Sequence, residues 1–279
     1  FLNLILYTNF KQKRFLKFPP WIIMESEKVE LRWKRDDGSW IFGGVPVGHT
    51  GKEVGILLRL NLLKKLKLGK MTLSVGCAIA AELQPLKKHG LITVGLDPER
   101  SFLLEGKAKD NADDFIQAIG ESIPLRDGSF DLVLLFEVLE HVLKPEVVLK
   151  EINRVLKPTG ILFLTVPNRF YLFETHGIQV CQKQINNLLG IGIPFFSLAP
   201  NFLRRRFERA RIYSDVEAVS LLRKHCFEPF IIEYLMPPLD MMRQTHLTRA
   251  IRQVFLYLSK VPIIKKFGAN IMVISKKRT

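Results

Sequence analysis

Acidic and imidazole side chains gather directly after one apolar run of the chain. Glu137, Glu140 and His141 follow the run 130–136, which is rich in Leu and Phe. An imidazole titrates near neutral pH and a carboxylate can accept a proton, so His141 and Glu137 are the candidate general bases of a group-transfer reaction. A simpler interpretation is that His141 caps this turn and packs under the next helix. Glu140 is expected to be solvated or paired.

A second pair of candidate residues, Tyr171 and His176, follows another apolar run at 161–166. They could line the pocket of an acceptor substrate, although an ordinary ordered loop would explain them equally well. The sequence predicts no metal centre, because its cysteines and histidines are not at metal-ligand spacing, and no Ser-His-Asp arrangement is visible. The few cysteines favour a reducing, cytoplasmic setting; they are Cys77, Cys181 and Cys226.

The elements that position these residues form a strand, a helix and a second strand. Residues 130–136 are a short apolar run that follows an Asp-Gly turn signal. Pro145 suits the first turn of a helix, apolar residues then recur at helical spacing, and Lys-Pro-Thr-Gly at 157–160 ends the helix. Residues 161–166 are the second strand. A helical crossover between apolar strands predicts parallel pairing in a covered sheet, whose ligands bind beyond the carboxyl ends of the strands.

The segment 127–168 closely resembles the class I S-adenosylmethionine (SAM)-dependent methyltransferases, in particular their small-molecule branch. Members carry an acidic-Gly-Ser-Phe-Asp strand, a Leu-Glu-His turn and a Leu-Lys-Pro-x-Gly helix end, which residues 127–131, 138–142 and 156–160 match. The resemblance runs from about Lys70 to Asn168 and resumes weakly from Tyr213 onward. It implies an α/β fold with a Rossmann-like, doubly wound, mostly parallel seven-stranded sheet and an antiparallel last strand. It also implies SAM as cofactor and methyl transfer to a small, apolar or anionic acceptor.

The glycine turn of this family has an altered form here. The family usually has an acid, one apolar residue and then Gly-Cys-Gly-x-Gly, whereas residues 74–80 are Ser-Val-Gly-Cys-Ala-Ile-Ala. The resemblance assigns Ser74, Gly76, Cys77 and Ala78 to the cofactor site, where backbone N–H groups would reach the carboxylate end of SAM. An alanine that must adopt a left-handed conformation costs about 1–2 kcal/mol relative to Gly. A penalty of that size weakens binding about tenfold, so we expect SAM binding of reduced affinity.

The ribose of the cofactor is assigned by the same resemblance to Asp97, which Pro98 follows. At this place the family carries an acid that accepts hydrogen bonds from both ribose hydroxyls. A carboxylate suits this role because it accepts in bidentate fashion and donates nothing. The position about twenty residues beyond a strand–turn–helix unit supports the assignment.

The adenine is assigned to residues 118–124, which align with the family's Gly-Asp-Ala-Glu-x-Leu-Pro. Ile119 replaces the Asp of that motif, while Gly120 and Glu121 keep the backbone path. We therefore expect main-chain hydrogen bonds and packing to hold the adenine. Phe136, at the end of the fourth strand, completes the predicted cofactor site.

The remaining patterns predict the rest of the sheet and its helices. Ser214 and Glu217 form a capping box that starts a helix running to about Lys224. Residues 101–113 show no clear preference. Further strands are expected at 71–77, 91–96, 114–119, 230–235 and 271–274, and further helices at 52–68, 80–89 and 248–260.

We expect an N-terminal extension at 1–49, partly disordered, and one methyltransferase domain at 50–279. Residues 1–23 are either a basic, apolar surface anchor or lie upstream of the true start, since Met24 opens a more ordinary sequence. Within the domain, a cap is expected at about 169–213. It could be a lid, a face that dips into a bilayer surface, or a packed insertion; its prolines and glycines argue against a membrane-spanning helix.

The chain carries a formal net charge of +15 over 279 residues. Its basic residues concentrate at 204–211 and 243–279, which favours an anionic partner such as a membrane surface, a nucleic acid or a phosphorylated substrate. A solvated basic surface is the plain alternative. A nucleic-acid substrate is less favoured, because residues 136–139 lack the Asn/Asp-Pro-Pro-Tyr/Phe motif of base-modifying relatives. We expect a cytoplasmic enzyme, peripheral at the membrane if it binds one; the rival is a non-catalytic binding module that uses the same scaffold and its basic face.

Overall fold

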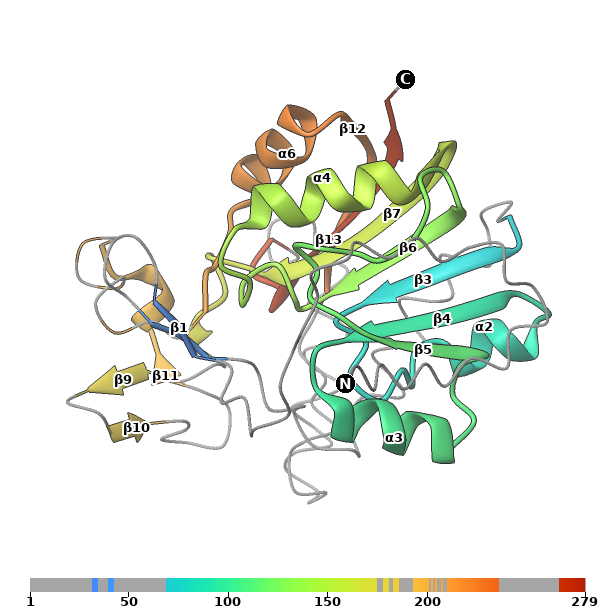
Figure 1. Ribbon diagram of the computed structural model, residues 1–279. Coiled ribbons are helices and arrows are strands. Elements are labelled where there is room, and N and C mark those ends of the chain that lie inside the picture. Colours follow the sequence, from blue (N-terminus) through green and yellow to red (C-terminus); the bar gives the residue numbers. More distant parts are fainter. Residues whose placement is uncertain are drawn as a thin grey trace, which may run out of the picture.

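The computed structural model of the chain contains one large sheet with helices on both faces (Figure 1). The helices expected at 52–68 and 248–260 lie outside the part of the chain that the structure describes. The described residues are 69–174, 193–200, 210–235 and 266–278, the short segments 32–34, 40–42, 178–180 and 183–185, and positions 202, 204 and 207.

The sheet has seven strands in the order β12-β13-β7-β6-β3-β4-β5. Neighbouring strands from β3 to β7 pair in parallel, whereas β13 is antiparallel to both β7 and β12. Six strands therefore run in one direction and the last strand runs against them, which confirms the predicted fold class. The strands are β3 (Met71–Val75), β4 (Ile92–Asp97), β5 (Asp114–Gln117), β6 (Phe130–Phe136), β7 (Leu156–Pro167), β12 (Phe227–Leu235) and β13 (Asn270–Lys277).

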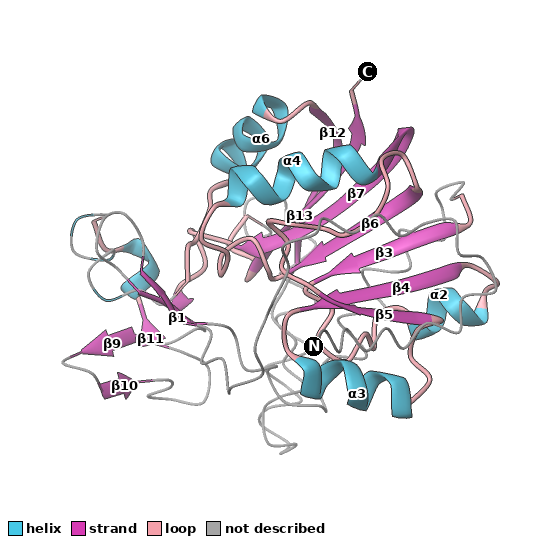
Figure 2. Cartoon of the chain, viewed as in Figure 1, coloured by secondary structure: helices cyan, strands magenta, loops and turns pink. Residues whose placement is uncertain are grey.

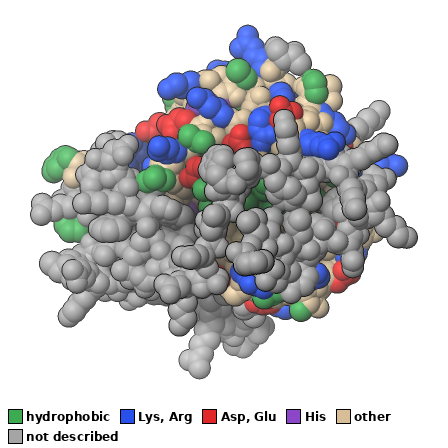
Figure 3. All heavy atoms as spheres, viewed as in Figure 1, with side chains coloured by type: hydrophobic (Ala, Val, Ile, Leu, Met, Phe, Trp, Pro, Cys, Tyr) green, Lys and Arg blue, Asp and Glu red, His purple; other side chains and the backbone are tan. Residues whose placement is uncertain are grey.

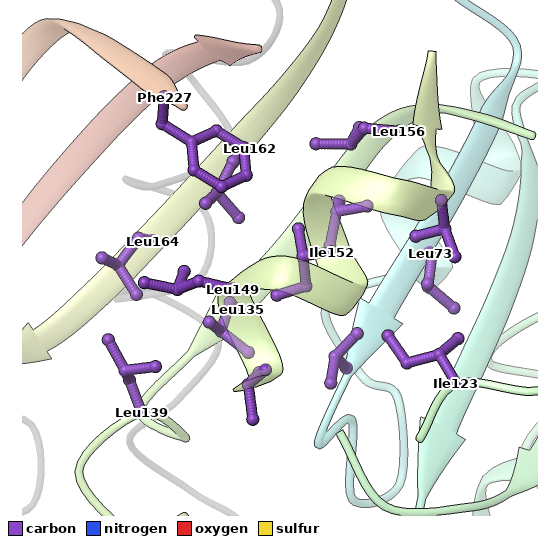
Figure 4. Close-up of a cluster of buried hydrophobic side chains, with 14 of the residues drawn as sticks. Leu73, Ile123, Leu135, Leu139, Leu149, Ile152, Leu156, Leu162, Leu164 and Phe227 are labelled. Carbon is purple, nitrogen blue, oxygen red and sulfur yellow. The ribbon is translucent and has the colours of Figure 1, made fainter. Parts of the chain in front are cut away.

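Two pairs of helices cover the two faces of this sheet (Figure 2). On one face, α4 (Pro145–Val155) and α6 (Asp215–Lys224) bury apolar side chains such as Ile152 and Leu222. Figure 4 shows α4 with Leu149 and Ile152 directed at side chains from the strands. On the other face, α2 (Gln84–Lys88) and α3 (Arg100–Ala108) contribute Leu86 and Leu103 to a second cluster. Burial on both faces explains why the central strands are continuously apolar rather than alternating.

Several predicted boundaries shift for local reasons. The helix expected at 80–89 shortens to α2, because Ala80 has a left-handed backbone and Pro85 fits only the first helical turn. The sequence showed no preference where α3 forms; Glu99 caps this helix by accepting a hydrogen bond from the Ser101 N–H at 3.1 Å. The helix α4 ends at Val155, directly before residues 157–160, as predicted, and these residues form an irregularity at the start of β7. The capping box of α6 is confirmed.

The segment 169–213 leaves the sheet and returns to it at one point. Asn168 and Tyr213 form a parallel bridge, and the Arg169 N–H donates to the Tyr213 carbonyl at 2.9 Å. Between these ends lie small paired strands that stand apart from the sheet in Figure 1. They are β8 (Phe173–Glu174), β9 (Ile178–Val180), β10 (Lys183–Ile185), β11 (Ile193–Pro194) and the 3₁₀ helix η1 (Phe196–Leu198), while β1 (Arg32–Lys34) and β2 (Trp40–Phe42) form a separate hairpin.

Candidate functional site

The turn between β3 and α2 has three residues with positive φ. Gly76 has φ 68°, Ala78 has φ 47° and Ala80 has φ 56°. The two alanines thus hold the left-handed conformation that favours glycine, each at a cost of about 1–2 kcal/mol. At Gly76 a side chain would also collide with Val138, because its Cβ would lie 2.4 Å from Val138 Cγ2. The shape expected of a glycine turn is therefore present although two of its glycines are absent.

Hydrogen bonds to β4 hold this turn in place. The N–H groups of Gly76 and Cys77 both donate to the Leu96 carbonyl, at 2.7 and 3.0 Å. The Ala78 N–H donates to Oδ2 of Asp97 at 2.8 Å. These three N–H groups have partners within the protein, and the assignment of the turn to the carboxylate end of the cofactor stays a prediction.

Asp97 lies at the carboxyl end of β4 and is only 7% exposed. Its Oδ2 accepts from Ala78 as described, and its Oδ1 accepts from the Glu99 N–H at 2.8 Å. Burial raises the pKa of this carboxyl, and the two backbone N–H groups oppose the rise. Each oxygen can accept a further hydrogen bond, so the fixed carboxylate fits the diol of a ribose.

The segment assigned to the adenine lies beside the ribose residues. The Ala118 N–H donates to the Asp97 carbonyl at 3.2 Å, and Gln117 Nε2 donates to the Pro98 carbonyl at 3.0 Å. Ile119, which replaces the family's Asp, exposes 36% of its surface. Gly120 is buried beneath it and Glu121 follows in a turn. The second and third sequence elements thus meet at one edge of the sheet.

Ser74 is buried in β3 and pairs with a carboxylate that the sequence reasoning missed. It is 1% exposed, and its Oγ donates to Oε1 of Glu82 at 2.6 Å. Glu82 lies in the turn before α2. Cys77, which lies between these two residues in the sequence, is also buried. Burial, and then the charges of Glu82 and Asp97, raise the pKa of its thiol well above the ordinary value. A protonated, buried thiol fits a packing role better than a nucleophilic one.

Glu137 follows β6 in a left-handed conformation, with φ 56°. Its Oε2 accepts a short hydrogen bond from Asn270 Nδ2, at the start of β13. Its Oε1 is buried and has no hydrogen-bond partner among the described residues. Phe136, just before it, packs edge-on against Phe163, with ring centroids 4.9 Å apart. Asn270 is the partner that sequence spacing could not reveal, because it lies 133 positions away.

His141 lies close to a buried acid. Its Nε2 is 3.8 Å from Oε1 of Glu140, and its N–H donates to the Val138 carbonyl at 2.9 Å. Glu140 is fully buried, so the solvated alternative for this residue is wrong and the paired one holds. Arg211 fixes the same turn, since its guanidinium donates to the carbonyls of residues 142 and 143.

Two arginines of the cluster at 204–211 therefore do not contribute to a solvated basic surface. Arg204 is 5% exposed and Arg211 is bound to main-chain carbonyls. On the face seen in Figure 3, basic and acidic side chains are interspersed around α4 and α6. Although the net charge of the chain is positive, the basic side chains in the described part of this face do not gather into one patch.

The predicted acceptor residues are only partly described. Tyr171 lies just beyond β7, where burial raises its pKa to about 12. Its carbonyl accepts a short hydrogen bond from Ser197 Oγ, which ties it to η1. His176 lies outside the described residues.

The described residues contain neither a candidate metal site nor a candidate membrane-spanning helix. His, Cys, Asp and Glu side chains there form no group of three that could hold a metal ion. None of the helices in the same residues combines the length and the apolar character that a membrane crossing needs.

Comparisons with known proteins show what the chain is similar to. A family model described as "Methyltransferase domain" matches residues 73–164. A ubiquinone biosynthesis O-methyltransferase from Bradyrhizobium diazoefficiens is 33% identical over 105 residues, which cover 36% of this chain and 41% of the relative. The mitochondrial protein of the same name from Homo sapiens is 30% identical over 161 residues, covering 52% and 43%. The chain thus spans less than half the length of these relatives.

A solved structure extends the likeness over most of the fold. The crystal structure of a SAM-dependent methyltransferase from Thermotoga maritima superposes with a TM-score of 0.53 at 20% identity, covering 82% of this chain and 91% of the other. At that identity the likeness shows the fold alone. The fold is therefore that of the SAM-dependent methyltransferases, and residues 73–164, which form the centre of the sheet, match the methyltransferase family model.

Proposed function

We propose that the protein transfers the methyl group of SAM to a small, apolar or anionic acceptor at the carboxyl edge of the sheet. The observation that carries this proposal is the carboxylate of Asp97, which is buried and fixed beside a turn with three positive φ angles. This arrangement survives although two glycines of the turn are replaced. A scaffold without a ligand would have no need of a strained turn next to a buried charge.

Three parts of the chain would hold the cofactor. Asp97 would accept hydrogen bonds from the ribose hydroxyls through both oxygens. The exposed side chain of Ile119 and the main chain at 118–122 would pack on the adenine. The turn at 76–80, together with Ser74, would line the methionyl end. When bound, SAM supplies an electrophilic methyl group on its sulfonium.

The acceptor side of the site is assigned to Glu137 and His141. The two relatives are named O-methyltransferases, which favours a hydroxyl acceptor here as well. As the new C–O bond forms and the C–S bond breaks, the proton leaves the hydroxyl, and the buried Oε1 of Glu137 can accept it. Asn270 would keep that oxygen in place by holding Oε2. His141 would assist from the adjoining turn.

The segment 169–213 would form the cap over this acceptor side. Its two ends meet at the carboxyl end of β7, and Arg211 binds the carbonyls that follow β6. Tyr171, held to η1, would line the pocket together with His176. Alignment of donor and acceptor with exclusion of water is the main task in such a transfer, and a cap serves both.

The same segment would carry the molecule to a membrane surface. Phe195, Leu198 and Phe202 are 66%, 48% and 81% exposed. Apolar side chains of this kind insert at the interface of a bilayer, and a net charge of +15 favours anionic lipids. An apolar acceptor could then be taken from the membrane by a cytoplasmic enzyme.

The test of cofactor binding is thermal unfolding with S-adenosylhomocysteine. We expect millimolar ligand to raise the Tm of the wild type by several degrees, because a ligand that binds only the folded state stabilises it. Asp97→Ala should weaken binding at least tenfold and remove most of the shift. Asp127→Ala is the control, since its side chain is 78% exposed and lies before β6, at the opposite edge. A wild type without any shift would favour the non-catalytic binding module instead.

A further inference from the structure

The side chain of Asn111, just beyond the end of α3, contacts the strained turn that follows β3. Its Nδ2 donates a hydrogen bond to the Ile79 carbonyl at 2.7 Å. Ile79 lies between Ala78 and Ala80, the two alanines with positive φ. Asn111 is only 5% exposed, so this hydrogen bond is shielded from water. A side chain that the cofactor motif of the sequence does not contain therefore holds the middle of the turn.

The C-terminus of α3 fixes the place of Asn111. Asp110 has a left-handed backbone, with φ 53°, and the Asn111 N–H donates to the Gly106 carbonyl at 3.1 Å. This hydrogen bond belongs to the Schellman motif, which ends a helix at a left-handed residue. Lys87 of α2 donates to the carbonyls of Asp110 and Ala112, at 3.4 and 3.3 Å. The backbone on both sides of Asn111 is thus held, and its side chain is directed at the turn.

Gly106, in the second turn of α3, leaves the room that this contact needs. A Cβ at this position would lie 2.6 Å from the Ile79 carbonyl oxygen and 2.9 Å from Cε1 of Phe115. Glycine inside a helix lowers the stability of that helix. The close approach of α3 to the turn is the reason for a glycine here.

The strain of the turn and the hydrogen bond from Asn111 are similar in size. A left-handed conformation is about tenfold less favourable for alanine than for glycine, and a shielded hydrogen bond is worth a similar factor. Strained backbone persists only where surrounding contacts hold it. The bonds to Leu96 and Asp97 hold residues 76–78, whereas Asn111 acts on the residue between the two alanines.

We propose that Asn111 is a positioning residue, which keeps the turn at 76–80 in the conformation that receives the methionyl end of SAM. The inference rests on the proposed function and explains how the site tolerates alanines where the family pattern has glycines. Without Asn111 the strained turn relaxes, and a ligand must then restore its conformation at a cost in affinity. A turn with glycine at position 78 is less strained and depends less on this support.

The experiment measures the affinity for S-adenosylhomocysteine by calorimetry in two backgrounds. In the wild type, Asn111→Ala should weaken binding about tenfold, because the hydrogen bond that opposes the strain is lost. In the Ala78→Gly background the same substitution should weaken binding by less than about threefold, since the two sites are coupled through the turn. Asn153→Ala is the matched control: its amide also donates to main-chain carbonyls, but from the last turn of α4. It should change the affinity by less than about twofold.

Amide hydrogen exchange follows the turn itself. The N–H groups of Gly76 and Cys77, which donate to the Leu96 carbonyl, should exchange about tenfold faster in Asn111→Ala than in the wild type. Their exchange should slow again when Ala78→Gly is added.

A substitution on α3 tests the same contact without changing Asn111. In Gly106→Ala the new Cβ displaces the Ile79 carbonyl, so binding of S-adenosylhomocysteine should weaken about tenfold. Alanine favours a helix more than glycine does, so α3 should still form in this variant.

The outcomes separate this inference from the proposed function. An equal loss of affinity from Asn111→Ala in both backgrounds would mean that Asn111 supports the fold without opposing the strain, and the inference would be overturned. Wild-type affinity in both Asn111→Ala and Gly106→Ala would overturn it as well, while SAM binding stands. A wild type that does not bind S-adenosylhomocysteine overturns the proposed function, and the inference with it.

Discussion

The side-chain methyl groups of two alanines in the turn after β3 strain the backbone of the proposed site. Ala78 and Ala80 both occupy the left-handed region, with φ 47° and 56°. Because the folded chain already holds them there, their cost falls on the free energy of unfolding rather than on ligand binding. The two positions differ in packing: Ala80 is fully buried and Ala78 is partly exposed.

Ala78→Gly should therefore stabilise the protein by about 1 kcal/mol, as the strain of a Cβ in the left-handed region is relieved. Ala80→Gly should be nearly neutral, because the relief is offset by the loss of a buried methyl group worth roughly 0.8 kcal/mol. Urea unfolding of the single variants measures both values. Ala81→Gly, next in the chain and without a positive φ, should destabilise by about 0.5–1 kcal/mol. Equal effects at all three positions would show that backbone strain is not the cause.

At the scale of the elements, the pairing of β4 with β5 contains two adjacent aspartates in different roles. Oδ2 of Asp113 accepts hydrogen bonds from the N–H and the hydroxyl of Thr93, both at 2.8 Å. Asp114 begins β5 and is 6% exposed. Burial, and then the charge of Asp113, raises the pKa of Asp114 to about 6. The Asp113 carboxylate therefore connects the two strands, whereas ionisation of the buried Asp114 carboxyl lowers the stability of the fold.

This difference predicts opposite effects of two similar substitutions. A pKa raised above the unfolded value of 3.8 means that the unfolded state ionises first, so ionisation of Asp114 destabilises the fold as pH rises from about 4 to 6. Asp114→Asn should then gain stability over the wild type across that range and keep a gain on the order of 1–3 kcal/mol at pH 8. Asp113→Asn should lose stability at pH 8. Chemical unfolding at pH 4, 6 and 8 tests this; a pH-independent difference for Asp114→Asn would contradict it.

At the scale of the whole molecule, we propose that the segment 169–213 controls what reaches the site from outside. It begins and ends at the carboxyl end of β7, so whatever binds its apolar side chains is brought near Glu137 and Tyr171. The charge of the chain is positive, yet Arg204 is buried and Arg211 holds main-chain carbonyls. Membrane attraction would therefore depend on exposed apolar groups as well as on charge.

We expect co-sedimentation with anionic vesicles, weaker with neutral ones and reduced at high salt. Phe202→Asp should reduce binding about tenfold, since it removes an inserted ring and adds a repelled charge. Val216→Asp, at a 72% exposed position of α6, is the matched control and should change binding little. Equal loss in both variants would mean that net charge alone governs the attraction, and no binding to either vesicle would exclude the membrane role.

The sequence by itself determined the architecture. Its apolar runs predicted the strands, because strands buried on both faces must be apolar throughout, and its turn residues predicted where β6 and α6 begin. The resemblance to a family assigned Asp97 and the turn at 76–80 to the cofactor site, and that role stays a prediction. Local patterns also predicted that α4 ends before residues 157–160, whereas they gave no sign of α3.

Only the tertiary structure showed which side chains act as pairs. Glu82 reaches Ser74 across a turn, Asn270 reaches Glu137 from the last strand, and Arg211 fixes the turn that carries His141. These contacts join residues 8, 133 and 69 positions apart. Spacing along the chain carries no information on them, because sheet order places β13 beside β7 and the return of the segment 169–213 places Arg211 beside the end of β6. The local sequence determines the conformation of each turn, whereas the order of the strands determines which polar and charged side chains lie next to that turn.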